Sequence, residues 1–311
     1  MQKLSTNFQR VLVTGGAGFI GGAVIRRLLK NTKVKIFNLD KMNYASNQCS
    51  IEKTFKENSN INQNRYELLN IDLFNKEETD RAIKISDPDL IIHLAAESHV
   101  DRSIKGPSIF IESNIIGTFN LLEASRKHYE NLNTMRRDNF RLLHVSTDEV
   151  FGSISNNQKF TESSPYDPRS PYSASKASSD HLIKAWNHTY GLPTLITNCS
   201  NNFGPWQFPE KLIPVAITRA LAGEYIPIYG DGENIRDWLY VEDHVNALFQ
   251  VIDKGLIGKS YCIGGDNEKS NKELIEQICH LLDIHNPRKS PHSSLIRFVK
   301  DRPGHDKHYA I

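Results

Sequence analysis

The chain has 311 residues, of which 39% are hydrophobic and 24% are charged. This is an ordinary globular composition, and the length suffices for one large domain or two modest ones. The formal net charge is +2, and basic and acidic residues are spread along the chain. This distribution argues against a nucleic-acid or membrane surface, so a phosphate-bearing partner would have to bind at a local site.

The four cysteines, Cys49, Cys199, Cys262 and Cys279, lie far apart in the sequence. They favour reduced thiols over a disulfide framework. No cluster of histidine, cysteine or acidic residues has metal-ligand spacing, so we predict no metal site. The N-terminus has no apolar signal core, and no stretch approaches the roughly 18 apolar residues that span a bilayer. We therefore expect a soluble protein located in the cytoplasm.

Short apolar runs alternate with amphipathic segments along the first 200 residues. Strand-like runs occupy 10–13, 34–40, 66–72, 89–96, 140–147 and 193–198. Apolar residues at helical intervals occupy 21–30, 75–85, 114–128 and 173–190. Gly191 is a natural helix C-cap, with Pro193 just beyond it. This alternation predicts an α/β fold of Rossmann type, a doubly wound parallel sheet with helices on both faces.

The pattern changes after about residue 200. Segments 201–214 and 229–238 are rich in glycine, proline, asparagine and aromatic residues, which suits binding loops. Helical patterns return at 241–253 and 271–283. We predict a Rossmann domain over 1–200 and a smaller, interleaved lobe that carries the binding loops over 201–311, with 236–263 returning to the first domain. Residues 45–64 are predicted to form a polar, mobile insertion.

A glycine-rich turn joins the first predicted strand to the first predicted helix. The GxxGxxG spacing of Gly15, Gly18 and Gly21 lets backbone N–H groups approach a pyrophosphate at the helix N-terminus. A glycine-rich turn without a ligand is the alternative for this motif alone. Asp40 ends the second strand, where a carboxylate hydrogen-bonds ribose hydroxyls and repels a 2′-phosphate. NAD is therefore favoured over NADP, although the charge of Lys41 could soften that exclusion.

Two groups of polar residues indicate redox chemistry. Ser146 to Glu149 follow the strand at 140–147, at the sheet edge where doubly wound folds bind ligands. Tyr172 and Lys176 lie one turn apart on one face of a predicted helix. A phenol with a pKa of about 10 is a poor base at neutral pH. We expect the Lys176 ammonium and the nicotinamide ring to lower the Tyr172 pKa by about 3 units, roughly 4 kcal/mol.

These motifs and several longer segments resemble the dTDP-glucose 4,6-dehydratases of the extended short-chain dehydrogenase/reductase superfamily. The resemblance runs from Val11 to Ala310. It is carried by HLAAESHVDRSI (93–104), HVSTDEVFG (144–152), SPYSASKASSDHL (170–182), TNCSNNFGPWQFPEKLIP (197–214), RDWLYVEDH (236–244) and DRPGHD (301–306). Thr147-Asp148-Glu149 is its most specific part, because epimerases and decarboxylases of the superfamily typically lack the adjacent Asp-Glu.

The resemblance implies a role for each of these residues. Oxidation at C4 of a hexose makes C5–H acidic, so loss of the C6 hydroxyl needs a base at C5 and an acid at O6. By resemblance Glu149 is that base and Asp148 is that acid. Tyr172 removes the O4 proton while hydride passes to NAD, and Thr147 hydrogen-bonds the same oxygen. Hydride return to C6 gives dTDP-4-keto-6-deoxyglucose and water, for deoxysugar biosynthesis such as that of rhamnose.

The resemblance also implies binding residues. Cofactor-binding positions match Gly15, Gly18, Phe19, Ile20, Gly21, Asp40, Lys41, Asn43, Asn70, Ile71, Leu94, Ala95, Ala96, Ser98, Ser113, Tyr172 and Lys176. Substrate-binding positions match Ser98, Thr147, Asn201, Asn202, Lys211, Leu212, Pro227, Tyr229, Arg236, Asn267, Arg302 and His305. Among the latter, the Arg236 guanidinium and the Asn202 amide fall at positions that bind the diphosphate, for which such donors are suited.

The sequence departs from the family pattern at three places. Asn70-Ile71 replaces the usual Asp-Ile that recognises the adenine amino group, and an amide oxygen accepts that hydrogen bond more weakly. Phe151 replaces a more usual tyrosine, which we expect to affect packing only. Relatives continue after the segment that ends at Ile311 through a helical stretch that closes the substrate lobe. The chain is either naturally short or truncated, and a truncated chain is expected to be less stable and to close the lobe less well.

Two alternatives fit parts of the sequence. A UDP-glucose 4,6-dehydratase or a nucleotide-sugar epimerase would share the glycines and the Tyr172/Lys176 pair, and the choice of thymidine over uridine depends on loops. A non-catalytic NAD-binding regulator would have lost catalytic residues that are all present here. Relatives pair through two long helices, here 114–128 and 173–190, so the resemblance implies a homodimer. The same apolar faces could instead pack within the chain.

Overall fold

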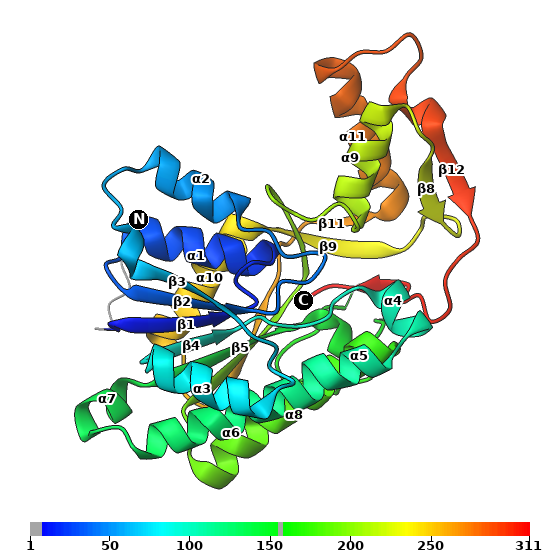
Figure 1. Ribbon diagram of the computed structural model, residues 1–311. Coiled ribbons are helices and arrows are strands. Elements are labelled where there is room, and N and C mark those ends of the chain that lie inside the picture. Colours follow the sequence, from blue (N-terminus) through cyan, green and yellow to red (C-terminus); the bar gives the residue numbers. More distant parts are fainter. Residues whose placement is uncertain (1–7, 155–157) are drawn as a thin grey trace.

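The computed structural model describes residues 8–154 and 158–311. A parallel seven-stranded sheet forms the centre of its larger part (Figure 1), with the strand order β10-β6-β5-β4-β1-β2-β3. The strands are β1 Arg10–Thr14, β2 Lys35–Asp40, β3 Tyr66–Asn70, β4 Leu90–His93, β5 Arg141–Thr147, β6 Thr194–Cys199 and β10 Ser260–Ile263. The strand order runs outward from β1 to β2 and β3 on one side and from β4 to β5 and β6 on the other, so the direction of the connections reverses between β1 and β4. This doubly wound arrangement confirms the predicted Rossmann fold.

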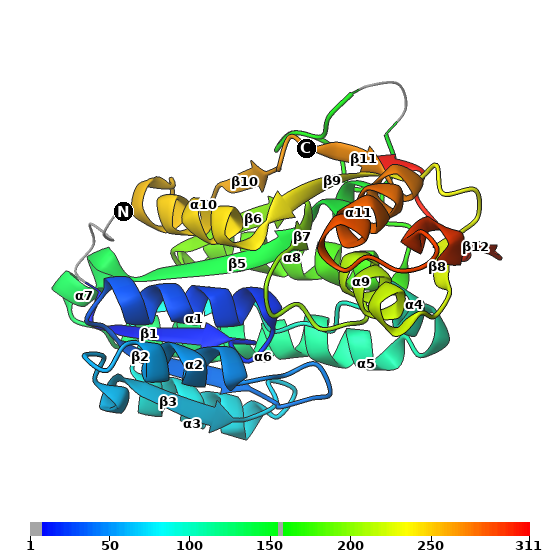
Figure 2. The same cartoon turned by 90° about the horizontal axis from the view of Figure 1, so that it is seen from above.

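Helices cover both faces of this sheet (Figures 1 and 2). One face carries α1 (Phe19–Asn31) and α10 (Val241–Lys254), with α2 (Cys49–Glu57) packed on α1; the other carries α3 (Lys76–Ser86), α6 (Gly117–Glu130) and α8 (Pro171–Tyr190). Successive residues of β1 point to opposite faces, so Val11 and Val13 enter one apolar core and Leu12 enters the other. Burial on both faces explains why the strands are continuous apolar runs.

Shorter elements connect these helices and strands. They are η1 Gln63–Arg65, α4 Val100–Lys105, α5 Ser108–Phe110, the π-helical turn η2 Ile111–Ile116, α7 Thr134–Asn139 and the 3-10 turn η3 Asp148–Phe151. The π-helical turn η2 leads directly into α6. Helix α8 begins with a capping box, in which Ser170 and Ser173 bond each other's backbone N–H, and it ends at Gly191 with a φ of 67°.

A smaller lobe lies beside the carboxyl ends of the strands (Figure 1). Its elements are β7 Asn201–Phe203, α9 Leu212–Ala222, β8 Ile226–Tyr229, β9 Ile235–Tyr240, β11 Glu268–Ser270, α11 Asn271–His285, η4 His292–Leu295, β12 Ile296–Val299 and β13 His308–Tyr309. Strand β9 pairs with β7, β11 and β13, and β8 pairs with β12. Ala216, Trp238 and Ile275 belong to a separate apolar core of this lobe. The division at residue 200 stays a prediction.

The expectation of a mobile insertion over 45–64 is wrong. This segment contains α2 and η1, and Ile51 and Thr54 are buried against α1. Only one side of α2 contacts the protein, so few of its residues need to be apolar. Its polar composition therefore concealed a packed helix. Within the described residues, no helix is both long and apolar enough to cross a membrane.

Candidate active site

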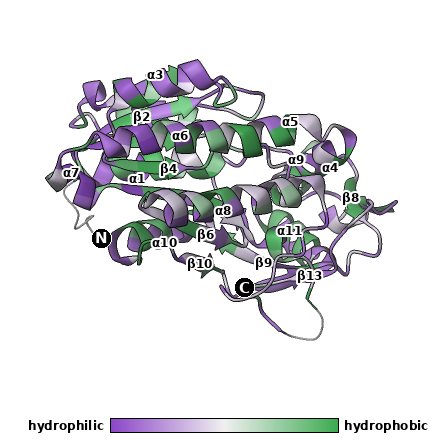
Figure 3. Ribbon diagram, turned by 90° about the horizontal axis from the view of Figure 1, so that it is seen from below, coloured by the Kyte–Doolittle hydropathy of each residue, from purple (hydrophilic) through white to green (hydrophobic). Residues whose placement is uncertain are grey.

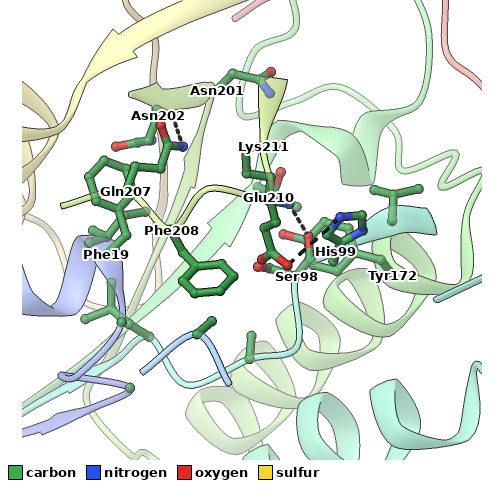
Figure 4. A pocket seen from close by; sticks show the side chains of 18 of the residues that line it. Phe19, Ser98, His99, Tyr172, Asn201, Asn202, Gln207, Phe208, Glu210 and Lys211 are labelled. Atoms are coloured by element: carbon green, nitrogen blue, oxygen red, sulfur yellow. Dashed lines mark hydrogen bonds and ion pairs between the residues drawn. The ribbon is translucent and has the colours of Figure 1, made fainter. Parts of the chain in front are cut away.

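The carboxyl ends of the central strands open into a cavity of about 590 Å³ that the lobe covers. Figure 4 shows part of its lining: Phe208, Glu210 and Lys211, from the loop that enters α9, lie opposite Ser98, His99 and Tyr172. The Lys211 Nζ donates a hydrogen bond of 2.6 Å to the Ser98 carbonyl. Segments more than 100 residues apart thus meet across the cavity.

The glycine turn between β1 and α1 is too tight for any side chain. Gly15 has a φ of 70°, and a Cβ there would lie 2.7 Å from the Ala95 nitrogen. A Cβ at Gly21 would lie 2.2 Å from the Gly15 carbonyl oxygen. Gly18, at the N-cap of α1, provides no side-chain cap, so the first N–H groups of the helix are available to an anion. The turn therefore fits the pyrophosphate of a dinucleotide.

Asp40 lies at the end of β2, beside this turn. One carboxylate oxygen accepts from the Ala17 N–H at 2.9 Å, and the other accepts from the Met42 N–H at 2.9 Å and the Ser46 hydroxyl at 2.7 Å. The carboxylate is thereby held at the position where a ribose would bind. A negative charge fixed at this position suits NAD better than NADP.

The ion pair that Lys41 makes does not favour binding of a phosphate by this lysine. Its Nζ lies 2.8 Å from Glu97 Oε1, and the Glu97 residue is only 6% exposed. Asn43 donates to the same oxygen at 3.3 Å. Because the Lys41 charge is neutralised by a buried carboxylate, it does not offset the repulsion of a 2′-phosphate by Asp40.

Thr147 ends β5 and caps the turn η3. Its hydroxyl accepts from the Glu149 N–H at 3.2 Å and donates to Asp148 Oδ1 at 3.3 Å. Asp148 Oδ2 is buried and has no hydrogen-bond partner in the protein. An orphaned oxygen beside a cavity is available to a ligand.

The two adjacent carboxyls have different electrostatic surroundings. Burial and the neighbouring charge of Glu149 raise the pKa of Asp148 well above its ordinary value, which favours the protonated form of Asp148. Burial also raises the pKa of Glu149, but the positive charges of Lys211, Arg302 and Arg236 oppose that rise. The pair can therefore hold one proton donor beside one proton acceptor.

Tyr172 and Lys176 lie one turn apart on α8 and both line the cavity. Burial, followed by the charge of Glu149, raises the pKa of Tyr172 well above its ordinary value. Burial lowers the pKa of Lys176 to about 8, and its Nζ donates to the Val145 carbonyl at 3.0 Å. The protein's own groups therefore do not produce the expected lowering of the Tyr172 pKa, because desolvation of the phenol dominates.

Positive side chains of the lobe lie on the other side of the cavity. The Arg236 guanidinium lies 3.9 Å from the Tyr309 ring centroid and donates to the Asp306 carbonyl at 2.7 Å. Arg302 contacts Asp101 Oδ1 at 3.3 Å. Arg302 and Arg236, together with Lys211, oppose the rise of the Glu149 pKa, so the lobe that carries these cations favours the ionised form of that carboxyl.

Asn202 is held by neighbours within the protein. Its Oδ1 lies 2.8 Å from His244 Nδ1, and its Nδ2 donates to the Ser200 carbonyl at 2.9 Å. Burial lowers the pKa of His244 to about 3, so this histidine is neutral. In this arrangement the Asn202 amide is positioned by the protein at the cavity wall.

Nearly all predicted site residues line this one cavity. They are Gly15, Gly18, Phe19, Ile20, Gly21, Asp40, Lys41, Asn43, Ile71, Leu94, Ala95, Ala96, Ser98, Ser113, Thr147, Asp148, Glu149, Tyr172, Lys176, Asn201, Asn202, Lys211, Leu212, Pro227, Tyr229, Arg236, Arg302 and His305. Their individual binding roles stay predictions. Within the described residues, no group of three or more histidine, cysteine or acidic side chains could hold a metal ion.

Two predicted residues lie outside the lining, and their binding roles stay predictions. Asn70 is exposed at the end of β3, whereas the next residues, Ile71 and Asp72, line the cavity. Asn267 is also exposed, and its N–H donates to Asp237 Oδ1 at 2.8 Å. In both cases the backbone places the side chain on the solvent side.

Several lining residues escaped the sequence analysis. Phe208 and Glu210 lie in the loop before α9, and Trp238 and Tyr309 lie on β9 and β13. Phe208 and Glu210 belong to the segment QFPEK, which lies within the stretch 197–214 that resembles the family, so the sequence could have identified them as candidates. Tyr309 follows a histidine in a short polar segment and carried none.

Comparison with known proteins shows extensive similarity. Residues 12–311 match a family model described as GDP-mannose 4,6 dehydratase. A dTDP-glucose 4,6-dehydratase of Neisseria meningitidis serogroup B is 51% identical over 308 residues, which cover 97% of this chain and 85% of that protein. dTDP-glucose 4,6-dehydratase 1 of Escherichia coli K12 is 50% identical, with coverage of 97% and 84%.

Solved structures agree with this relationship. The dTDP-glucose 4,6-dehydratase of Streptomyces venezuelae, crystallised with NAD and TYD bound, is 40% identical with a TM-score of 0.85, and the match covers 97% of this chain and 88% of that chain. The UDP-glucose 4-epimerase of Thermus thermophilus, in complex with NAD, is 27% identical with a TM-score of 0.82 and coverage of 97% and 90%.

Replacement of Gly21 by alanine tests the fit of the glycine turn to a dinucleotide. The new Cβ would overlap the Gly15 carbonyl, so the turn has to open and its N–H groups lose their alignment. We expect NAD affinity to fall at least tenfold, measured by calorimetry on protein stripped of nucleotide. Gly191→Ala is the control, because Gly191 lies outside the turn and its added Cβ has no atom within 4 Å; its φ of 67° means that the loss of stability is measured beside the NAD affinity. Equal NAD affinity in both variants would contradict the assignment of the turn.

Proposed function

Because this chain belongs to the dTDP-glucose 4,6-dehydratase family of the extended short-chain dehydrogenase/reductases, we propose that it converts dTDP-glucose to dTDP-4-keto-6-deoxyglucose and water. This is the activity of an NAD-dependent hydro-lyase. The observation that carries the proposal is the pair Asp148 and Glu149 at the cavity wall, one carboxyl favoured as acid and the other as base. NAD, bound at the glycine turn and Asp40, would accept hydride from C4 and return it to C6.

The protein's own residues supply the proton transfers. Tyr172 takes the proton of O4, with the Thr147 hydroxyl beside it, and the Lys176 ammonium one turn away favours the phenolate. Oxidation at C4 places C5–H alpha to a ketone, which makes that hydrogen acidic.

The two carboxyls then divide the elimination between them. Glu149 removes the C5 proton, because positive lobe residues favour its ionised form. Asp148 donates a proton to O6, because burial keeps it protonated, and water leaves. A protonated Glu149 would be no base and an ionised Asp148 no acid, so the reaction depends on this split.

Two other functions are less well supported by the site. A nucleotide-sugar 4-epimerase shares the fold and the Tyr172/Lys176 pair, but its reaction has no elimination step that would use a buried acid beside a base. A non-catalytic NAD-binding regulator would not need Thr147, Asp148 and Glu149 gathered at one cavity with Tyr172. The positively charged wall formed by Lys211, Arg236 and Arg302 supports binding of a nucleoside diphosphate sugar.

Incubation with nucleotide sugars tests the proposal directly. Purified protein with NAD is offered dTDP-glucose and UDP-glucose in parallel, and 4-keto-6-deoxysugar formation is followed by NMR. We expect product from dTDP-glucose at a higher kcat/KM than from UDP-glucose. Faster turnover of UDP-glucose would shift the assignment to a UDP-glucose 4,6-dehydratase. A C4 epimer with no loss of water would assign an epimerase, and no product from either sugar would refute the dehydratase.

Substitution of the two carboxyls tests their separate roles. Glu149→Gln removes the base, so we expect product formation to fall by about 10²–10⁴-fold and exchange of C5–H with D₂O to stop. Asp148→Asn is the corresponding carboxyl-to-amide change at the proposed acid: it removes the acidic proton and leaves the base in place. It should slow water loss while C5–H still exchanges, as measured by NMR of the sugar. Retained exchange in Glu149→Gln would show that another group is the base.

We also propose that two copies pair through α6 and α8. Figure 3, seen from the side of these helices, shows hydrophobic residues along α5 and α6. The exposed ones include Ile109, Ile116 and Phe119, and Tyr190 is exposed at the end of α8. Phe119 packs edge-to-face on Trp186 at 5.8 Å, so α6 and α8 form one continuous surface. An exposed apolar patch of this kind favours self-association.

A charge placed on that surface tests the dimer. Phe119→Glu should convert the protein to a monomer at micromolar concentration, measured by sedimentation velocity, because a carboxylate would be buried at the interface. Phe298→Glu is the matched control, since Phe298 is 56% exposed on β12 of the lobe. A dimer that survives Phe119→Glu unchanged would exclude this interface.

A cytoplasmic location is part of the proposal. The structure shows Cys49, Cys199, Cys262 and Cys279 as free thiols. Free thiols, two of them buried, are typical of proteins from a reducing compartment.

A further inference from the structure

Asp180 lies one turn beyond Lys176 on α8 and is completely buried. One of its oxygens, Oδ2, accepts hydrogen bonds from the Ser146 hydroxyl at 2.9 Å, the Tyr166 hydroxyl at 2.9 Å and the Asn198 amide at 3.2 Å. All three donors are uncharged. A carboxylate held in this way stays ionised, although it lies in a region of low dielectric.

His144, on β5, lies between Asp180 and the catalytic lysine. Its Nε2 is 3.2 Å from Asp180 Oδ1 and 3.4 Å from Lys176 Nζ. The imidazole is buried, and burial, followed by the charge of Lys176, lowers its pKa to about 4. His144 is therefore neutral at neutral pH and adds no charge of its own. Of the three residues Lys176, His144 and Asp180, only Lys176 and Asp180 therefore carry a formal charge.

A buried, ionised carboxylate is costly unless it acts on a nearby cation. The elements around Lys176 and Asp180 present these titratable groups: His93 on β4, His144 on β5, Asp148 and Glu149 on η3, Tyr166 before α8, Tyr172 on α8, Cys199 on β6 and Cys262 on β10. Burial keeps Asp148 protonated and raises the pKa of the Cys199 thiol to about 12. Asp180 is thus the ionised carboxylate that favours the charged form of Lys176.

We propose that Asp180 is a positioning residue for the reaction: across His144, its fixed negative charge keeps the Lys176 ammonium protonated one turn from Tyr172. The proposal rests on the proposed function, because C4 oxidation needs Lys176 in its charged form. In this proposal Asp180 affects the charge of Lys176 in addition to joining α8 to β5 and β6 through hydrogen bonds. The Lys176 pKa is already lowered to about 8 by burial, and loss of the Asp180 charge would lower it further.

The pH profile of Asp180→Asn tests this role. Asparagine keeps the shape and can still accept from Ser146 and Tyr166, but it removes the charge. In the wild type, kcat/KM should fall as the pH rises through about 8, where Lys176 loses its proton. In Asp180→Asn this alkaline limb should move down by about one pH unit or more, because a lost counter-charge lowers the pKa of a buried lysine.

A second readout does not need turnover. The titration of Lys176 itself is followed by NMR of the lysine Cε in protein labelled with ¹³C-lysine, and the signal is identified by its absence in Lys176→Met. In Asp180→Asn this titration should move down by about one pH unit or more, because the ammonium has lost its buried counter-charge. If Asp180→Asn does not fold, Asp180→Ser is used instead, since a smaller side chain leaves room for water to accept from Ser146.

Tyr166→Phe is the matched control. It removes one hydrogen bond to Asp180 and leaves the charge, so its alkaline limb should stay at the wild-type pH. A limb that stays in place in Asp180→Asn with only a lower maximum, or one that moves equally in Tyr166→Phe, would overturn the proposal. Failure of the wild type to turn over dTDP-glucose would instead refute the proposed function, and the NMR titration of Lys176 would still decide the role of Asp180.

Discussion

Exclusion of water from the carboxyl end of β5 determines the chemistry of this site. Asp148 is 1% exposed and Lys176 is 4% exposed. In such surroundings the charged form of a carboxyl or an ammonium is disfavoured unless another charge compensates for it. Asp148 is compensated by one cation, Arg236, and feels the charge of Glu149 as well, so its protonated form is favoured, whereas Glu149, one residue further on, faces three cations. Desolvation thus gives two chemically similar side chains opposite roles.

The fold supplies this asymmetry through the relation between the sheet and the lobe. Asp148 and Glu149 follow β5 in the Rossmann sheet, but Lys211, Arg236 and Arg302 come from the lobe. A base at Glu149 therefore requires the lobe to lie over the strand ends. The contact of Lys211 with Ser98, 2.6 Å across the cavity, joins the two parts beside the site. Binding of a diphosphate would compete for the same cations, which couples substrate charge to the basicity of Glu149.

The sequence alone is sufficient to predict those parts of the site that follow from a local pattern of residues. Continuous apolar runs identify buried parallel strands, and polar residues at their ends meet because parallel strands end at one edge. Helix α2 was missed because only one side of it is buried. The Lys41–Glu97 pair and the Asp180 network join residues distant in sequence, and the raised pKa of Tyr172 follows from burial. None of these features produces a periodic pattern in the sequence, so only the structure could show them.

Tyr172, the proposed base, has to ionise where the protein itself opposes ionisation. Burial and Glu149 both raise its pKa, so a positive charge within reach is a requirement of C4 oxidation. Lys176 is the source of that charge on the same helix, yet burial brings its own pKa down to about 8. The same exclusion of water that separates Asp148 from Glu149 would therefore disable the base if the lysine were left alone. A second buried charge, Asp180, is the compensation that such a dry site needs.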